Sequence, residues 1–106
     1  MLVRLWETRF DPTRKAELVD YANDISLPVL ASRPGCCGVL FFSQGDRWIT
    51  QTIWSDQRSL EALGTDPDYT RIVAGILALN VLQLEQTTTV YEVSGGTNTF
   101  CSEKPQ

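Results

Sequence analysis

Histidine does not occur in this chain of 106 residues, and its three cysteines are Cys36, Cys37 and Cys101. Histidine is the side chain most often used for general acid–base catalysis near neutral pH and for binding transition metals. Three cysteines, two of them adjacent, also lack the number and spacing of a zinc site or a disulfide framework. We therefore expect no metal site and no bound cofactor.

Basic residues and long apolar runs are also scarce. The chain has 9 Lys and Arg against 13 Asp and Glu, a formal net charge of −4, and its basic residues are scattered. Nucleic-acid binding needs clustered basic side chains, so we expect no nucleic-acid partner. No apolar run reaches the roughly 20 residues of a membrane span, and the apolar start, Met1 to Glu7, includes charges. We therefore predict no membrane partner and a cytoplasmic location.

The remaining sequence has the composition of one globular domain. Hydrophobic residues make up 42% of it and charged residues 21%, which are ordinary values for a chain too short to form two cores. Apolar alternation and β-branched residues predict strands at 2–10, 37–43, 47–54 and 87–93. Asp11-Pro12 and Asp66-Pro67 each place an N-cap before a proline at the first helical position, so each predicts the start of a helix.

Apolar residues at helical spacing follow both Asp-Pro pairs. After the first pair they are Leu18, Ala22, Ile25 and Val29, and after the second they are Tyr69, Ile72, Val73, Ile76, Leu79 and Leu82. Pro28 should kink or end the first helix, and a short third helix is expected between Asp56 and Gly64. The order β-α-β-β-α-α-β predicts an α+β ferredoxin-like sandwich over residues 1–96, with a polar tail at 97–106.

Both faces of the predicted sheet carry apolar residues. With a hairpin loop at Gln44-Gly45-Asp46, one face holds Trp6, Phe10, Leu40, Phe42 and Trp48, and the other holds Val3, Leu5, Val39, Phe41, Ile49 and Ile53. Helices cover only one face, and soluble monomers rarely expose so large an apolar patch. We therefore predict a homodimer whose two sheets pack face to face. The alternative is an outer face that is merely less polar than average.

Several motifs together resemble one known family. They are the first strand with Asp11-Pro12, the loop Arg33-Pro34-Gly35 followed by Gly38, the segment Ile53-Trp54-Ser55-Asp56, and Leu60-Glu61-Ala62-Leu63 with Asp66-Pro67-Asp68-Tyr69. In this pattern, over most of residues 2–94, the chain resembles the antibiotic biosynthesis monooxygenase (ABM)-like family of dimeric α+β barrels. The resemblance implies two protomers packed sheet to sheet, each with a small-molecule pocket between its helices and its own sheet. It specifies the fold better than the chemistry.

The sequence departs from part of that family. Haem-degrading members use an asparagine in the first strand, a tryptophan at the end of the third, and a haem-ligating histidine on the following helix. This chain keeps Trp54, has Trp6 in place of the asparagine, and has Val73 near the histidine position. Haem ligation of that type is excluded. The resemblance still permits cofactor-free oxidation of aromatic polyketides, whose own carbanions react with oxygen in a site that holds the developing negative charge.

Six residues are candidates for such a site. Trp54 and Tyr69 are candidate catalytic residues, because an indole N–H or a phenol hydroxyl can donate to a developing oxyanion. The candidate substrate-binding residues are Trp6, Thr52, Arg4 and Asn80. Structural roles are the alternatives: core packing for the three aromatic residues, a salt bridge for Arg4, and a helix-terminal hydrogen bond for Asn80.

The sequence thus favours a cofactor-independent, monooxygenase-like protein that acts on a small hydrophobic or aromatic molecule, such as a quinol or a polyketide, between helices and sheet. The alternative is a non-catalytic small-molecule-binding or stress-related protein whose pocket is closed by large side chains, and Trp6 favours that view. A cavity of at least ~300 Å³ beside Trp54 would indicate a ligand site, whereas a filled interior would indicate the alternative.

Overall fold

The computed structural model describes residues 1–97, without the side chain of Leu84, so nearly all of the predicted tail at 97–106 lies outside the described residues. Within them, one antiparallel sheet has the strand order β2-β3-β1-β4. Its strands are β1 (Leu2–Phe10), β2 (Cys36–Gln44), β3 (Arg47–Trp54) and β4 (Leu82–Glu92). This is the ferredoxin-like α+β architecture that the sequence predicts.

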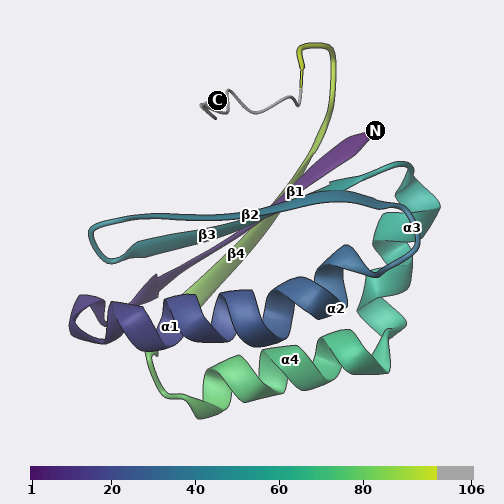
Figure 1. Cartoon of the computed structure of the whole chain (residues 1–106). Helices are drawn as coiled ribbons and strands as arrows, with labels where there is room; N and C mark the ends of the chain where they lie inside the picture. The colour runs from purple at the N-terminus through teal and green to yellow at the C-terminus, as the bar shows by residue number, and fades with distance from the viewer. Residues whose placement is uncertain (98–106) are drawn as a thin grey trace, which may run out of the picture.

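The helices lie on one face of the sheet and at one of its ends (Figure 1). They are α1 (Lys15–Tyr21), α2 (Leu27–Ala31), α3 (Gln57–Ala62) and α4 (Pro67–Ala78). As predicted, Asp66 caps α4: its carboxylate accepts the backbone N–H groups of Asp68 and Tyr69 at 2.8 and 3.2 Å. No helix of residues 1–97 is long and apolar enough to cross a membrane.

The β2–β3 hairpin corrects the predicted sheet faces. Gln44 pairs with Arg47, so the loop is the two residues Gly45-Asp46 and not the predicted three. Gly45 has φ +60, which suits the first position of a two-residue hairpin turn. A change of one residue in register moves every side chain of a strand to the opposite face. Val39 and Phe41 therefore lie on the helix side, and Leu40 and Phe42 lie on the outer side.

The first helix differs from its prediction in the middle. Residues Ala22–Ser26 form a π-helical turn between α1 and α2, where a helix has more residues per turn. Pro28, in the first turn of α2, lacks the N–H that an α-helical bond to the carbonyl four residues earlier would need. The wider turn shifts the buried face, so Ser26 is buried and Ile25, predicted to be apolar core, is 46% exposed.

Helix α4 is shorter than its predicted apolar stripe, and β4 begins earlier than predicted. Asn80 has φ +58, a left-handed conformation that ends the helix and turns the chain, so Leu82 starts the strand rather than continuing the stripe. Arg14 donates to the backbone carbonyls of Leu79 and Asn80 at 3.0 and 3.1 Å, which satisfies groups left free at the helix end.

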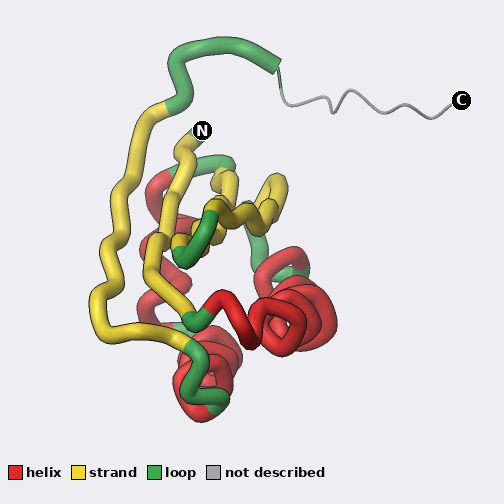
Figure 2. The backbone as a smooth tube through the Cα atoms, turned by 90° about the vertical axis from the view of Figure 1, so that its left-hand side faces the viewer, coloured by secondary structure: helices red, strands yellow, loops and turns green. Residues whose placement is uncertain are grey.

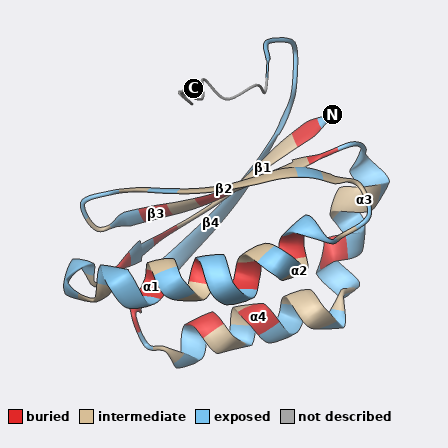
Figure 3. Cartoon of the chain, in the orientation of Figure 1, coloured by how far each residue is buried: buried red, intermediate tan, exposed pale blue. Residues whose placement is uncertain are grey.

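The core lies between the sheet and the helices, whereas none of the residues 1–97 forms a layer over the other side of the sheet (Figures 2 and 3). Along β3 the helix-facing residues Trp48, Thr50, Thr52 and Trp54 are all buried. The outer face carries half-exposed apolar residues: Val3, Leu5, Leu40, Phe42, Ile49 and Ile53. In β4, the residues from Glu85 to Glu92 are all exposed.

Candidate functional site

A cavity, here called the inner cavity, lies between the helix-facing side of the sheet and the helices. Arg4 and Trp6 of β1, Trp48 and Thr50 of β3, Ser26 of the π-helical turn and Tyr69 of α4 line it. Its other walls are apolar. It leaves about 40 Å³ open to the centre of a water molecule. One water needs ~10–15 Å³ by that measure, so the inner cavity has room for about three waters.

The polar pair of the inner cavity is Arg4 and Tyr69. Nη2 of Arg4 donates to the hydroxyl oxygen of Tyr69 at 3.1 Å, and the guanidinium carbon lies 5.7 Å from the centroid of the ring. The strand partners of Arg4 are Thr52 and Val90, neither of which is charged. Half-buried Arg4 forms no ion pair with any described residue.

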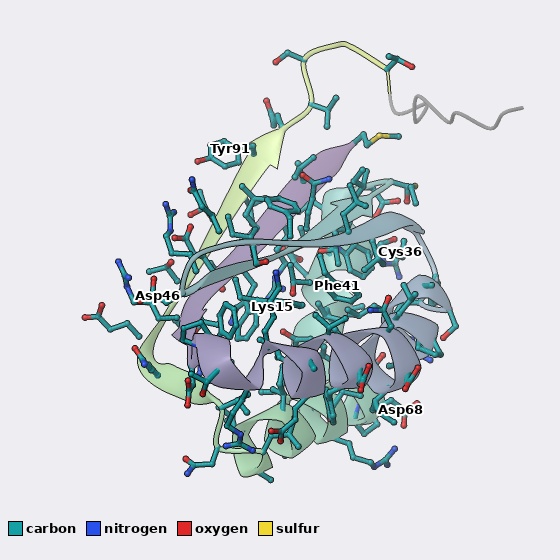
Figure 4. The ribbon with its side chains drawn as sticks, turned by 60° about the vertical axis from the view of Figure 1, so that its left-hand side comes forward. Lys15, Cys36, Phe41, Asp46, Asp68 and Tyr91 are labelled. Carbon is teal, nitrogen blue, oxygen red and sulfur yellow. The ribbon has the colours of Figure 1, made fainter. Side chains whose placement is uncertain are left out.

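Aromatic packing fixes the sheet side of the inner cavity. Nε1 of Trp48 donates to Oγ1 of Thr50 at 3.1 Å. The Trp48 ring stacks on Phe41 with centroids 5.8 Å apart and meets Phe10 edge-on at 6.1 Å. Figure 4 shows Phe41 between β2 and the helices. Such stacked and edge-on contacts hold the rings in place, so this wall is preformed.

A close contact between α1 and α4 fixes the helix side. The hydroxyl of Tyr21 donates to the carbonyl of Ile72 at 2.7 Å. A Cβ atom on Gly75 would lie only 2.1 Å from that hydroxyl oxygen, so glycine is required for this approach. Burial raises the pKa of Tyr21 above its usual value, so the hydroxyl stays a neutral donor.

Trp54 and Thr52, two of the predicted site residues, lie outside the inner cavity. Both are fully buried, and Nε1 of Trp54 donates to Oγ1 of Thr52 at 2.8 Å. Trp54 packs in a core cluster with Leu2, Leu30, Leu63 and Ile72. Its indole N–H is therefore already bonded. Leu30 and Ile72 belong to this cluster and also line the inner cavity.

Asn80, another predicted binding residue, is exposed at the end of α4, where its role is the left-handed turn described above. Of the six predicted residues, the structure therefore brings together Arg4, Trp6 and Tyr69. It places the other three elsewhere.

Sequence reasoning did not select Trp48, Thr50 and Ser26 as cavity residues. The alternation of β3 carried a signal for the first two, because Trp48 and Thr50 share a face with Trp54. Ser26 had a weaker signal, since only the π-helical turn before Pro28 brings it inward.

A second depression, of about 240 Å³, lies beside α3 with Trp54 beneath it. Three of its lining residues are charged, Arg33, Arg58 and Asp66, and Arg33 pairs with Asp66. Arg33 donates to Asp66 at 2.6 Å and to the backbone carbonyl of Val29 at 3.1 Å. The hydrogen bond from Arg33 holds the pKa of Asp66 below its usual range. The guanidinium of Arg33 therefore has partners within the protein, whereas most donors of Arg4 in the inner cavity have none among the described residues.

The two cysteines among the described residues, Cys36 and Cys37, do not form a reactive site. Cys36 and Cys37 are free thiols, and burial raises the pKa of Cys36, which keeps it protonated and poorly nucleophilic. Among residues 1–97, no three potential metal-ligating side chains of His, Cys, Asp or Glu come together.

The architecture and the inner cavity define a ferredoxin-like α+β domain with a hollow between helices and sheet. Neither a scan of known family models nor a search of curated proteins finds a match to the sequence. Solved structures do match. A monooxygenase of Streptomyces coelicolor in complex with the ligand nanaomycin D has a TM-score of 0.78 at 16% identity, with 93% of this chain and 92% of that chain covered.

Two further structures show the same fold. A Deinococcus radiodurans protein, provisionally named as an antibiotic biosynthesis monooxygenase, has a TM-score of 0.74 at 17% identity, covering 94% of this chain and 99% of that one. A Nitrosomonas europaea protein of unknown function has a TM-score of 0.75 at 15% identity, covering 93% and 94%. At these identities the likeness shows the fold, and at that level it confirms the resemblance to the ABM-like family.

Proposed function

We propose that this protein is monooxygenase-like and binds a small hydrophobic or aromatic, quinol- or polyketide-like molecule in the inner cavity, where it oxidises the molecule without a cofactor. The observation that carries the proposal is the Arg4–Tyr69 pair in an otherwise apolar hollow. Hydrogen-bond donors in a largely apolar hollow favour a developing oxyanion. The ligand complex of the Streptomyces coelicolor protein supports small-molecule binding in this fold.

The proposed reaction starts with loss of a proton from an activated CH₂ group of the substrate. No histidine or carboxylate is among the residues that line the inner cavity, so the proton passes to water. Arg4 and Tyr69 stabilise the resulting enolate and so lower the pKa of the substrate. The carbanion reduces O₂ and forms a C–O bond, giving a hydroperoxide after protonation. Loss of water then leaves a ketone, so that CH₂ and O₂ become C=O and H₂O.

The other predicted site residues receive supporting roles in this proposal. Trp54 and Thr52 hold the wall that Leu30 and Ile72 present to the inner cavity, and Asn80 ends α4. A folded Trp54→Phe variant should then retain most of the turnover. A large loss of turnover would indicate that Trp54 is a catalytic residue after all.

We also propose the homodimer that the sequence predicted. Its support is the outer face, where Leu40, Phe42, Ile49 and Ile53 remain half-exposed in a single chain and Phe42 is 42% exposed. Burying such a face against a second copy stabilises the pair by roughly 25 cal/mol per Å². Sedimentation should show a dimer at micromolar concentration, and Phe42→Asp should shift it to the monomer. A monomeric wild-type protein would overturn this part of the proposal.

A cytoplasmic location remains a prediction. It rests on the three cysteines, which have neither the number nor the spacing of a disulfide framework.

The second candidate function is non-catalytic binding of a small molecule. The sizes of the hollows favour it, because the depression beside Trp54 measures about 240 Å³, below the predicted ~300 Å³, and the inner cavity, which Trp6 lines, only about 40 Å³. In this case a ligand would bind with no uptake of oxygen.

Oxygen uptake with quinol and anthrone substrates separates the two functions. Tyr69→Phe removes the hydroxyl and should lower kcat at least ~10-fold. Tyr91→Phe is the matched control, since Tyr91 is an exposed tyrosine that points away from the helices (Figure 4). Wild-type protein that consumes no oxygen with any such substrate would overturn the enzymatic proposal.

A further inference from the structure

The arginines of this chain differ in how their charge is balanced. Of the seven arginines, five form ion pairs: Arg9 with Asp46, Arg14 with Glu17, Arg33 with Asp66, Arg47 with Glu7, and Arg71 with Asp68. Arg58 is exposed to water. Arg4 alone among the seven is both half-buried and without a carboxylate partner in the described residues.

Even partial withdrawal of an unpaired guanidinium from water is unfavourable, and Arg4 is half-buried. The Tyr69 ring offsets part of that cost through a cation–π contact at 5.7 Å. It does not satisfy the N–H groups, because a guanidinium carries five of them and only one bonds to a described residue. The free donors lie in a cavity whose other walls are mostly apolar.

Tyr69 and Ser26 add donors on the helix side. The Tyr69 hydroxyl accepts its bond from Arg4, so its own proton is available for an acceptor, and no described residue takes it. The hydroxyl of Ser26, which also lines the inner cavity, likewise bonds to no described residue and, like the free Arg4 donors, stays accessible to solvent. Donors from β1, the π-helical turn and α4 thus line one hollow, and no carboxylate lines it.

The size of the inner cavity limits the ligand. Room for about three waters, at ~30 Å³ each in the liquid, is close to the volume of a single aromatic ring. Phe41, Trp48 and Trp6 supply flat apolar walls for such a ring. Among the substrates of the proposed function, a single-ring quinol would fit this space, whereas a fused-ring anthrone or polyketide would require these aromatic side chains to move.

From the unpaired donors and the size together, we infer that the inner cavity binds a single-ring aromatic oxyanion, which pairs its negatively charged oxygen with Arg4 and Tyr69. The inference deepens the proposed function, on which it rests for the choice of cavity. It does not depend on oxidation. An aromatic carboxylate and a phenolate share this chemistry, so the test distinguishes them.

The test compares benzoate with benzamide, which is nearly the same size and neutral. NMR titration can follow the indole N–H signals of Trp6 and Trp48, which line the inner cavity, while Trp54 serves as an internal reference. Benzoate should bind with a millimolar Kd and at least ~10-fold tighter than benzamide, because a charge-assisted hydrogen bond is the stronger one. Equal binding of the two, or no benzoate binding at ~10 mM, would overturn the inference.

Substitutions at Arg4 locate the preference. Arg4→Gln should bring the two affinities to within ~2-fold, whereas Arg4→Lys should keep part of the preference, and Arg47→Gln is the matched control on the outer face. A folded Arg4→Gln variant that still prefers benzoate would contradict the assignment. 4-Nitrophenol, which ionises near neutral pH, tests whether the site also binds phenolates. Tighter binding at pH 8.5 than at pH 6 would show that it does. Unchanged binding would restrict the site to carboxylates.

The two proposals fail in different ways. A preference for benzoate without oxygen uptake by any substrate would retain the anion site and overturn the oxidation. Oxygen uptake without that preference would retain the oxidation and overturn the anion site.

Discussion

The two ends of β3 carry the same pair of residues with different outcomes. Trp48 donates to Thr50, and Trp54 donates to Thr52, all on the helix-facing side. Around Trp54 the leucines and Ile72 pack against the ring, which is fully buried. Trp48 and Thr50 instead line the inner cavity. Identical local chemistry therefore becomes either core or cavity wall, according to what the helices place opposite it.

Two half-buried arginines show the same contrast between the Trp54 core and the inner cavity. Arg33, next to the Trp54 cluster, bonds to Asp66 and to a backbone carbonyl. Arg4, in the inner cavity, bonds only to a tyrosine hydroxyl. Paired polar groups indicate a structural role, whereas a half-buried charge without a carboxylate partner in an apolar hollow indicates a binding role. The comparison assigns stability to the Trp54 region and binding to the Arg4 region.

Trp54→Ala is expected to have the largest effect on stability. Removing a fully buried tryptophan should lower the free energy of unfolding by about 3–5 kcal/mol, because the closed cluster cannot refill the space. Urea unfolding measures the change. In Trp54→Phe, which should stay folded, benzoate affinity should match the wild type, whereas Trp48→Phe should alter it. Lost affinity in folded Trp54→Phe would break the division between the two regions.

Gly75→Ala tests the contact that sets the distance between α1 and α4. Alanine is the better helix former, yet its Cβ would clash with the Tyr21 hydroxyl, so we expect a loss of about 1–2 kcal/mol in urea unfolding. Tyr21→Phe removes the clashing oxygen, and in that background Gly75→Ala should cost at least ~1 kcal/mol less. Additive effects of the two substitutions would show that the contact is not the cause.

Asp66→Asn tests the paired region through pH. Arg33 and two backbone N–H groups lower the pKa of Asp66 below the unfolded value of about 3.9. The carboxylate therefore stabilises the fold above about pH 4, and this contribution is lost as pH falls through the folded pKa. The wild type should exceed Asp66→Asn in stability at pH 7, and the difference should shrink toward pH 2. Asp20→Asn, on an exposed residue of α1, is the control.

The sequence predicted the order of strands and helices along the chain, and where the helices start, because those signals are local. Asp11-Pro12 and Asp66-Pro67 begin helical segments as expected. The errors arose where a single extra or missing residue changes which side chains of a strand or helix face the core. A hairpin loop of two residues instead of three moved Phe41 to the helix side. The wider turn before Pro28 brought Ser26 inward and turned Ile25 outward.

The candidate site was predictable only in part, for a related reason. Alternation along β1 placed Arg4 and Trp6 on one face, and helical spacing placed Tyr69 at the start of α4, so these three could be selected. Which tryptophan of β3 meets open space depends on packing between elements far apart in sequence. No local pattern could show that Leu30 and Ile72 separate Trp54 from the inner cavity.

Arg4→Met is expected to have the smallest effect on stability and, unlike the preceding substitutions, to raise the free energy of unfolding. A thioether side chain fills similar space without an unpaired charge, so the variant should be about 0.5–1 kcal/mol more stable than wild type, as is common where function requires a destabilising group. Arg47→Met, which removes an exposed ion pair with Glu7, should be neutral or slightly destabilising. Thermal unfolding measures both, and saturating benzoate should raise the Tm of the wild type and of Arg47→Met only. A variant at Arg4 that is less stable by more than about 1 kcal/mol would instead make Arg4 a structural residue, and the contrast with Arg33 would disappear.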